Sequence, residues 1–137
     1  MSDTNPDCIF CRIANHEVPA EVVYEDDLVV GFKDAHPVAP IHVLIVPRKH
    51  IPTLNDVYAD DNIVSHMAFA ARKIAEDLGV ADTGYRFSMN VNRGGGQIVF
   101  HLHAHLMAGK NLVTLVIRLA VITSIMWGKL VKLLRKK

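Results

Sequence analysis

The stretch from Val99 to Met107 carries the residues best suited to chemistry. Its three histidines, His101, His103 and His105, occupy every second position, with apolar residues between them. Because successive side chains of a β-strand point to opposite faces, this spacing predicts a strand with three imidazoles in a row on one face and an apolar row on the other. Imidazole can act as a nucleophile, a general acid or base, or a metal ligand. The outer two histidines would lie about 13 Å apart on a straight strand, so one ion cannot bind both ends of the row.

Two cysteines form a second chemical motif, Cys8-Ile-Phe-Cys11. In a reducing compartment this spacing is typical of half a zinc site or of a redox pair, and a redox pair usually needs a thioredoxin-like βαβ context, which the sequence lacks. Zinc is therefore favoured, with histidines as the remaining candidate ligands; the alternative is two buried thiols without a metal. The start of the chain, MSDTNPDC, has no apolar leader, so we expect a cytoplasmic protein without a disulfide.

The segments before the histidines supply the elements that must position them. Residues 21–24 and 28–32 are apolar runs separated by acidic turn residues, which predicts a β-hairpin. Residues 33–40 contain two prolines and predict a loop. Asp34 lies where the second strand ends, and it is either a ligand-reading carboxylate or a solvated turn residue. Next, residues 42–47 predict a mostly buried strand.

A helical period then replaces the strand pattern. Apolar residues recur at three- and four-residue steps from Asp60 to Leu78, which predicts one amphipathic helix that stops at Gly79. His66 lies off the apolar stripe, so we expect it to be solvated. Residues 85–91 predict a further strand. The glycine-rich turn at residues 92–97 can bring backbone amides close to an anion or can serve only as a flexible turn.

The order of elements predicts an α+β fold with a mainly antiparallel sheet of about five strands, one long helix and a short N-terminal helix. The chain has 137 residues, of which 50% are hydrophobic, and this suits one compact domain. Its formal net charge is +1, so no overall field argues for a nucleic-acid partner.

The run from Gly95 to Leu106 closely resembles the H-x-H-x-H signature of the histidine triad proteins, in the branch of small nucleoside phosphoramidases and nucleotidyl hydrolases. Linked motifs extend the resemblance backward through Asn90, the predicted helix, HVLIVPRKH and the FKD loop, over about residues 8–109. The resemblance implies a histidine triad domain at residues 1–109 and a hydrolase of purine nucleoside phosphoramidates or related nucleotidyl compounds. It also implies a homodimer.

The resemblance further implies roles for individual residues. His103 would attack the α-phosphorus to give a nucleotidyl-histidine that water cleaves, with His105 as the second catalytic residue. The implied substrate-binding residues are Asp34, His42, Asn90, Gln97, Ile98 and His105. Some bacterial members bind zinc, and the implied ligands of one structural zinc per chain are Cys8, Cys11, His50 and His101.

For three of these residues the sequence also allows a purely structural role or a weaker contact. Asn90 could instead cap a strand, and Gln97 could close a turn. Ile98 stands where the phosphoramidase branch often has a hydroxyl residue, so it can donate only through its backbone.

Residues 110–137 depart from the family and form an atypical apolar and basic tail. If the tail is a helix, Thr114 and most of the basic residues fall within about 40° of one line at about 100° per residue, which suits a membrane surface. The alternatives are a helix packed on the domain or on a dimer partner, β-strands, and a departure of the reading frame. Because the family's C-terminal segment helps to form the neighbouring active site, the tail also permits a second function: a catalytically weak, zinc-stabilised nucleotide-binding or interaction module.

Overall fold

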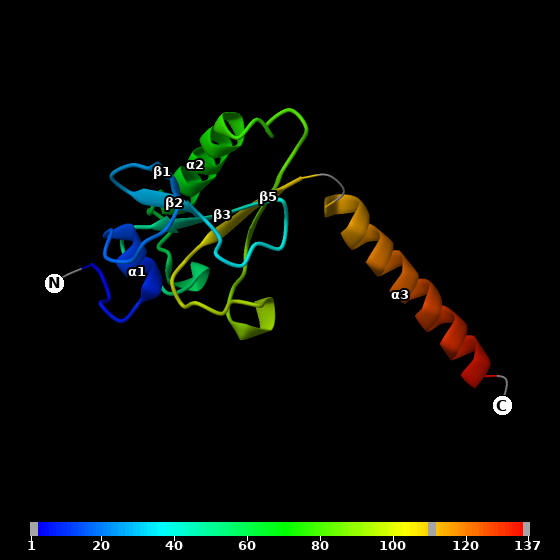
Figure 1. The fold of residues 1–137 in the computed structure, drawn as a ribbon. Coiled ribbons are helices and arrows are strands. Elements are labelled where there is room, and N and C mark those ends of the chain that lie inside the picture. The colour runs from blue at the N-terminus through cyan, green and yellow to red at the C-terminus, as the bar shows by residue number, and fades with distance from the viewer. Residues whose placement is uncertain (1–2, 110–111, 136–137) are drawn as a thin grey trace.

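The computed structural model describes residues 3–109 and 112–135, with the side chains of 112–119 excepted. Its described helices and strands form one five-stranded sheet with helices around it (Figure 1). The helices are α1 (Ile9–Ala14), α2 (Ile63–Asp77) and α3 (Leu112–Leu134), and two 3-10 turns span Leu54–Asp56 and Arg93–Gly95. The strands are β1 (Val22–Glu25), β2 (Val29–Lys33), β3 (Ile41–Pro47), β4 (Arg86–Met89) and β5 (Ala104–Ala108).

The strands lie in the order β1-β2-β3-β5-β4, and every neighbouring pair is antiparallel. This arrangement confirms the predicted α+β class, the five-stranded antiparallel sheet, the long helix and the short N-terminal helix. The predicted hairpin is β1 with β2, and α2 ends before Gly79, whose φ of +72° suits a residue without a Cβ. β3 and β5 lie side by side in the middle of the sheet, so the element that carries His105 is central.

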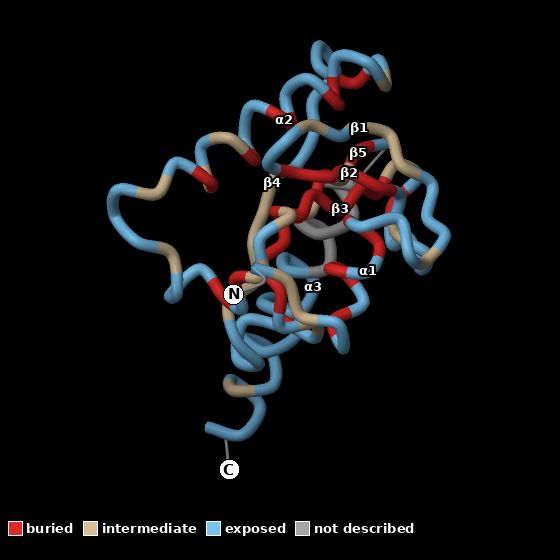
Figure 2. Tube along the Cα trace, turned by 90° about the vertical axis from the view of Figure 1, so that its left-hand side faces the viewer, coloured by how far each residue is buried: buried red, intermediate tan, exposed pale blue. Residues whose placement is uncertain are grey.

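Both faces of the sheet are covered, and alternate residues of the same strands serve the two faces. Val29 and Ile45 pack with Met67 and Ile74 of α2 in one core cluster. The alternate residues of β2 and β3 point to the other face and pack against α1. This second cluster is made of Cys8, Phe10, Cys11, Ile13, Ala14, Val30, Phe32, Leu44 and Val46. Figure 2 shows this burial concentrated in the strands between the two helices. α1 and its cysteines are therefore held against the sheet by apolar packing.

The predicted histidine strand is shorter than the motif. β5 begins at Ala104, so His101 and His103 precede it and only His105 lies in a strand. The ladder between β3 and β5 ends at Ile45 and Ala104. The ring of His101 donates to the carbonyl oxygen of Pro47 at 2.8 Å. His101 and His103 are buried, and His105 is half-buried.

His66 is only partly solvated, whereas the sequence predicted a solvated surface histidine; its side chain is 34% exposed. From α2 it reaches the turn between β1 and β2, where its Nε2 lies 2.7 Å from the Oδ2 atom of Asp26. The hydroxyl of Tyr24 donates to the same oxygen at 2.7 Å. A position off the apolar stripe of α2 therefore lies within reach of the β1–β2 turn and gains a polar partner there.

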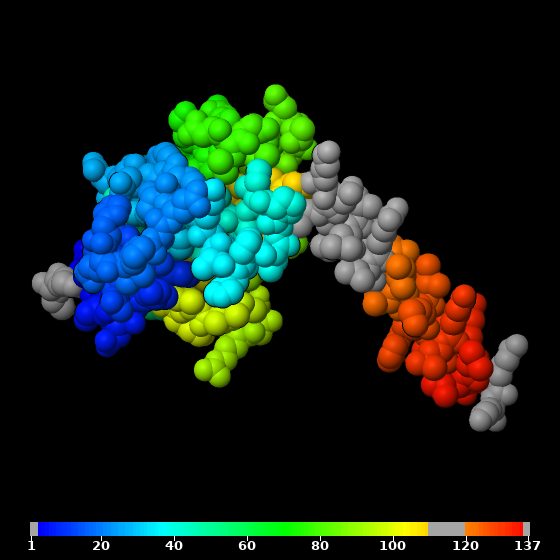
Figure 3. Space-filling model, viewed as in Figure 1, coloured from blue at the N-terminus to red at the C-terminus, as the bar shows by residue number. Residues whose placement is uncertain are grey.

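The helical interpretation of the tail is confirmed by α3, which extends away from the sheet (Figures 1 and 3). Between residues 120 and 135 its side chains are exposed, apart from the half-buried Val131. Within the parts of the chain that the structure describes, no helix has both the length and the apolar character to cross a bilayer.

Candidate active site and metal centre

A cavity of about 700 Å³ opens beside the two later histidines of the triad. Its walls come from α1, from β2 and the loop after it, from β3, and from the segment that leads to β5. Most of its lining is apolar, and Phe10 and Phe32 form part of it. Five residues predicted for the substrate site also line it: Asp34, Asn90, Ile98, His103 and His105. This volume falls within the range of small-molecule sites.

His103 has a tautomer that its hydrogen bond determines. Its Nδ1–H donates to the backbone carbonyl oxygen of His101 at 2.7 Å. A neutral imidazole carries one proton, so the Nε2 atom of His103 keeps a lone pair. The ring of Phe10 packs edge-on to it, with centroids 5.2 Å apart. His103 therefore presents an unprotonated nitrogen in a largely dry setting.

His42 and His105 form a hydrogen-bonded pair beside it. The backbone N–H of Val38 donates to Nδ1 of His42 at 3.2 Å, so the proton of a neutral His42 lies on Nε2. That Nε2–H donates to Nδ1 of His105 at 2.9 Å. The remaining proton of His105 must then lie on Nε2, a buried atom that has no hydrogen-bond partner among the described residues. A buried donor without a partner marks a place where a ligand acceptor fits.

The pKa values of this pair keep both rings neutral near pH 7. Burial is the largest cause for His105 and, together with the nearby His103 and His42, lowers its pKa to about 4. Burial also lowers the pKa of His42, although the carboxylate of Asp34 opposes the shift. The neutral states are the ones that the hydrogen-bond chain requires.

Asp34 lies close to the pair and lines the cavity. Its Oδ1 accepts from the backbone N–H of His36 at 2.9 Å, and its Oδ2 lies 3.5 Å from Nε2 of His42. The polar atoms of Asp34, His42 and His105 lie within 4.8 Å of one another, as ligands of a cation would. However, His42 accepts a hydrogen bond on Nδ1 and so carries its proton on the nitrogen that would ligate. The arrangement suits a hydrogen-bond chain and disfavours a metal at this cluster.

The glycine-rich turn places the remaining predicted residues. The side chain of Gln97 is buried; it accepts from the backbone N–H of Asn92 and donates to the carbonyl oxygens of Pro52 and Val99. These bonds hold the turn, and a direct substrate contact of Gln97 stays a prediction. Ile98 is 88% exposed at the mouth of the cavity. Asn90 lines the cavity near Gly96, whose φ of +85° allows the tight turn.

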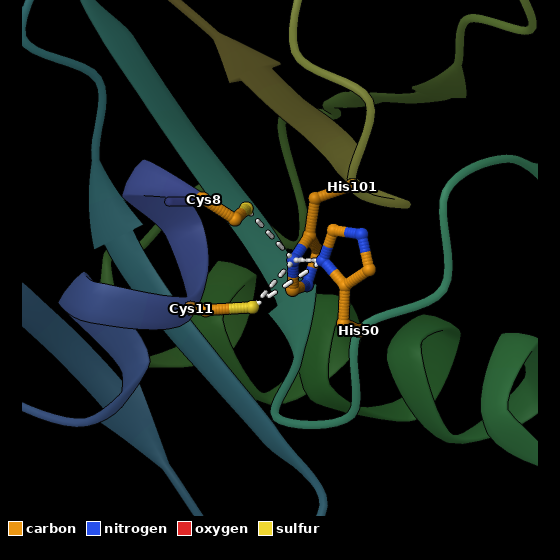
Figure 4. A group of neighbouring side chains, drawn as sticks. All are labelled: Cys8, Cys11, His50 and His101. Atoms are coloured by element: carbon orange, nitrogen blue, oxygen red, sulfur yellow. Dashed lines mark hydrogen bonds between the residues drawn. The ribbon is translucent and has the colours of Figure 1, made fainter. Parts of the chain in front are cut away.

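The second cluster joins the cysteine motif to two histidines, as Figure 4 shows. Cys8 and Cys11 lie at the start of α1, His50 follows β3, and His101 precedes β5. The Nδ1 atom of His101 lies 3.4 Å from Sγ of Cys8, 3.5 Å from Sγ of Cys11 and 3.3 Å from Nδ1 of His50. Nδ1 of His50 lies 3.3 Å from Sγ of Cys11. Four donor atoms thus surround one point.

These distances fit a tetrahedral zinc site. With Zn–N bonds of about 2.0–2.1 Å and Zn–S bonds of about 2.3 Å at tetrahedral angles, two nitrogen ligands lie about 3.3–3.4 Å apart and a nitrogen and a sulfur about 3.5–3.6 Å apart. Because Nε2–H of His101 donates to the carbonyl oxygen of Pro47, its Nδ1 keeps the lone pair that ligation needs. Burial lowers the pKa of His101 to about 4 and raises the pKa of Cys11. A cation at this point favours the thiolate form, against the effect of burial on Cys11.

Some functional contacts carry no signal in the sequence. Three backbone groups set the tautomers of His101, His103 and His42: the carbonyl oxygens of Pro47 and His101 and the N–H of Val38, respectively. Backbone groups are the same in every sequence. Phe10, which packs on both His101 and His103, could have been found, because it lies between the two cysteines.

The chain is similar to known proteins over most of its length. The family model of the HIT domain matches residues 15–112. The purine nucleoside phosphoramidase of Escherichia coli (strain K12) is 50% identical over 105 residues, which cover 76% of this chain and 88% of that protein. A HIT family hydrolase from Legionella pneumophila Philadelphia 1 has 48% identity and a TM-score of 0.74, covering 76% of this chain and 94% of its own. A Zn-bound histidine triad family protein from Mycobacterium smegmatis has 30% identity and a TM-score of 0.70 over 77% of each chain.

Proposed function

Because this chain belongs to the HIT domain family and is an enzyme of the histidine triad hydrolase type, we propose that it hydrolyses purine nucleoside phosphoramidates or related nucleotidyl compounds. One observation carries the proposal: a buried imidazole with its lone pair on Nε2, that of His103, lines a cavity large enough for a nucleotide. The phosphoramidase activity of the Escherichia coli relative supports the substrate class.

The first step is attack by His103. The lone pair on its Nε2 forms a bond to the α-phosphorus while the bond from phosphorus to the leaving nitrogen breaks. The leaving nitrogen takes a proton from solvent and departs as an amine, and the nucleotidyl group stays on His103. The carbonyl oxygen of His101 accepts from Nδ1–H and so stabilises the positive charge that develops on the ring.

His105 stabilises the negative charge on the phosphoryl oxygens. Its Nε2–H is a buried donor without a partner among the described residues, so a phosphoryl oxygen can accept from it without displacing another bond. His42 holds that donor in place through its bond to Nδ1 of His105. In the second step the oxygen of a water bonds to phosphorus, the bond to Nε2 of His103 breaks, and the proton of the water passes to solvent. Nucleoside monophosphate leaves and His103 is restored.

The sugar and base would lie along the rest of the cavity. Asp34 is placed to accept from ribose hydroxyls through Oδ2, and Phe10 and Phe32 offer apolar contacts to a base. Asn90 and the backbone of Ile98 are proposed as further donors to the phosphate.

Substitution of His103 tests the chemistry. With adenosine phosphoramidate as substrate, we expect His103→Ala to lower kcat by about 10³-fold or more while nucleoside monophosphate still binds. A rapid quench at neutral pH followed by intact mass analysis should find a nucleotidyl adduct on the original protein and none on the variant. Turnover that survives in His103→Ala contradicts the proposed nucleophile.

We also propose one structural zinc per chain on Cys8, Cys11, His50 and His101, supported by the donor distances and by the Zn-bound Mycobacterium smegmatis relative. When bound, the ion neutralises two thiolates and ties α1 to the segments beside β3 and β5. Metal analysis of reduced protein should find about one zinc per chain, and Cys8→Ser with Cys11→Ser should remove it. A metal-free protein of unchanged stability contradicts this site and leaves the proposal for His103 intact.

A homodimer is proposed as well. β4 is an edge strand whose outer side pairs with no other strand of the described chain, and such an edge can pair with a second copy.

One observation favours a second candidate function. The HIT domain match ends at residue 112, so nearly all of α3 lies outside it. If residues 110–137 stand where the active site needs another segment, the chain would bind nucleoside monophosphate with little turnover. The same assay decides between the two, because a binding module gives affinity without release of product.

A further inference from the structure

An exposed apolar surface covers α3 between residues 120 and 135. Its large apolar side chains are 49–70% exposed: Val121, Ile122, Ile125, Met126, Trp127, Leu130, Leu133 and Leu134. Apolar patches of this extent on a water-exposed helix mark a surface that is covered by something else.

Charge and apolar side chains are segregated over the last turns of this helix. At about 100° per residue, Lys129, Lys132 and Arg135 fall within one sector of about 120°. Met126, Trp127, Leu130, Leu133 and Leu134 fall within an opposite sector of similar width. Val121 and Ile125 project within the basic sector, so the amphipathic part is residues 126–135.

All charges of this segment have one sign. From Lys110 onward the sequence contains no Asp or Glu, and its charged residues are Lys110, Arg118, Lys129, Lys132, Arg135, Lys136 and Lys137. A second copy of α3 packed on the apolar sector would leave the basic sectors on the outer sides of the pair, with no acidic partner to offset their charge. A nucleic acid would pair the cations but would leave the apolar sector in water. An anionic lipid surface matches both sectors, since it offers phosphates beside an apolar phase.

We propose that α3 binds the surface of a bilayer that contains anionic lipids. The helix lies in the plane of the interface, with Met126, Trp127 and Leu130 among the upper acyl chains and Lys129, Lys132 and Arg135 at the headgroup phosphates. It does not span the bilayer, in keeping with the lack of a long enough apolar helix among the described residues. The proposal does not depend on the hydrolase activity; it adds the membrane surface as the place where the domain is held.

Trp127 provides the measurement, because it is the only tryptophan of the chain. Full-length protein is mixed with vesicles of phosphatidylcholine alone or with phosphatidylserine added. With anionic vesicles we expect a blue shift of the tryptophan emission, less quenching by acrylamide, and co-sedimentation that weakens as salt rises. Each basic residue should strengthen binding on the order of fivefold at low salt.

Matched variants separate the two sectors. The triple variant Lys129→Gln, Lys132→Gln and Arg135→Gln should weaken binding on the order of 100-fold at low salt, whereas Lys129→Arg with Lys132→Arg should bind as the original does. Met126→Glu with Leu130→Glu should abolish the blue shift. Hydrolysis of a soluble substrate and the far-ultraviolet circular dichroism spectrum report that each variant is folded.

Several results would overturn the proposal. The first is the absence of a shift and of co-sedimentation with anionic vesicles at low salt. The second is equal binding to neutral vesicles. The third is a blue shift that grows with protein concentration without vesicles, which would assign the apolar sector to a second copy. The last is a short DNA duplex that displaces the protein from the vesicles while acrylamide still quenches Trp127 in the DNA complex. This result would assign the charges to nucleic acid.

Discussion

The three histidines of the H-x-H-x-H motif differ in what their second ring nitrogen contacts. His101 donates from Nε2 to the carbonyl oxygen of Pro47, His103 donates from Nδ1 to the carbonyl oxygen of His101, and His105 accepts on Nδ1 from His42. The other ring nitrogen of His101 carries a lone pair toward the cysteines, and that of His103 carries a lone pair at the cavity. The other ring nitrogen of His105 carries an N–H donor. Under the proposed function, one residue type therefore serves as a metal ligand, a nucleophile and a hydrogen-bond donor.

At this scale the donor on His105 gives a prediction. His105→Phe removes the Nε2–H, and we expect kcat to fall by about 10²- to 10³-fold while the affinity for nucleoside monophosphate changes little, since the donor acts on charge that develops in the transition state. His105→Gln keeps an N–H donor and should lose less. His16→Asn, at an exposed residue of φ +59° far from the triad in sequence, is the control and should keep full activity. Equal rates for His105→Phe and the original would remove His105 from the chemistry.

At the scale of elements, α1 links the proposed metal centre to the cavity beside His103. Its cysteines belong to the Cys–His cluster, and Phe10 between them lines the cavity and packs on both His101 and His103. An ion bound to the cysteines would therefore hold the ring that shapes the pocket.

We predict that loss of the metal weakens substrate binding as well as stability. Cys8→Ser with Cys11→Ser should lower Tm by several degrees and should also raise the Kd for nucleoside monophosphate several-fold, because α1 is no longer anchored. Calorimetric titration and thermal unfolding measure the two effects. Arg12→Ala changes an exposed side chain of the same helix and should alter neither. A lower Tm with unchanged affinity would show that α1 keeps its place without the ion.

A second contact between elements joins α2 to the β1–β2 turn through Asp26. Partial burial works to raise the pKa of Asp26, but it is outweighed by hydrogen bonds from the N–H groups of Leu28 and Val29, the hydroxyl of Tyr24 and the ring of His66, which lower the pKa from 3.8 to about 2. Since the folded pKa lies below the unfolded one, the stabilisation is present above pH 3.8 and is lost as pH falls toward 2.

Asp26→Asn tests this contact. It should lower the free energy of unfolding by about 1–2 kcal/mol at pH 7, allowing for the partial exposure of the pair, and by much less near pH 2. Urea unfolding at the two pH values measures the change. Asp77→Asn, which removes an exposed i,i+4 partner of Lys73, should cost only a few tenths of a kcal/mol at either pH. A difference in unfolding free energy that does not change with pH would mean that the charge of Asp26 plays no part in this contact.

For the whole molecule, the sheet and α3 point to two different associations. The sheet has an open edge at β4, whereas α3 presents an apolar and cationic surface away from it. The first suits a second copy of the domain and the second suits a lipid surface.

We predict a dimer that does not depend on α3. Light scattering of the purified protein should give about twice 15.2 kDa. Met126→Glu with Leu130→Glu should keep that mass, because the proposed interface lies at the β4 edge. A variant that becomes monomeric would place α3 in the interface, and a monomer in both proteins would contradict the dimer.

The amino-acid sequence by itself predicted most of the helices and strands and the residues that could do chemistry. Periods of two and of about 3.6 residues predicted the hairpin, β3, α2 and the helical tail, because the pattern of apolar side chains is a local property. The linked motifs identified the family, and with it the candidate residues from Cys8 to His105.

Tertiary structure alone decided how those residues are used. The strand that carries the triad begins only at Ala104, and His66 pairs with Asp26. The ring proton of His101 is directed by the carbonyl oxygen of Pro47, and that of His103 by the carbonyl oxygen of His101. The ring of His42 directs the proton of His105. The contacts with Pro47 and with the ring of His42 join segments far apart in the chain, and the carbonyl acceptors are atoms that every residue shares, so the spacing of the histidines does not encode these contacts. Spacing alone therefore predicted three equivalent imidazoles, the family resemblance implied a different role for each, and the folded chain gives each a different hydrogen-bond partner.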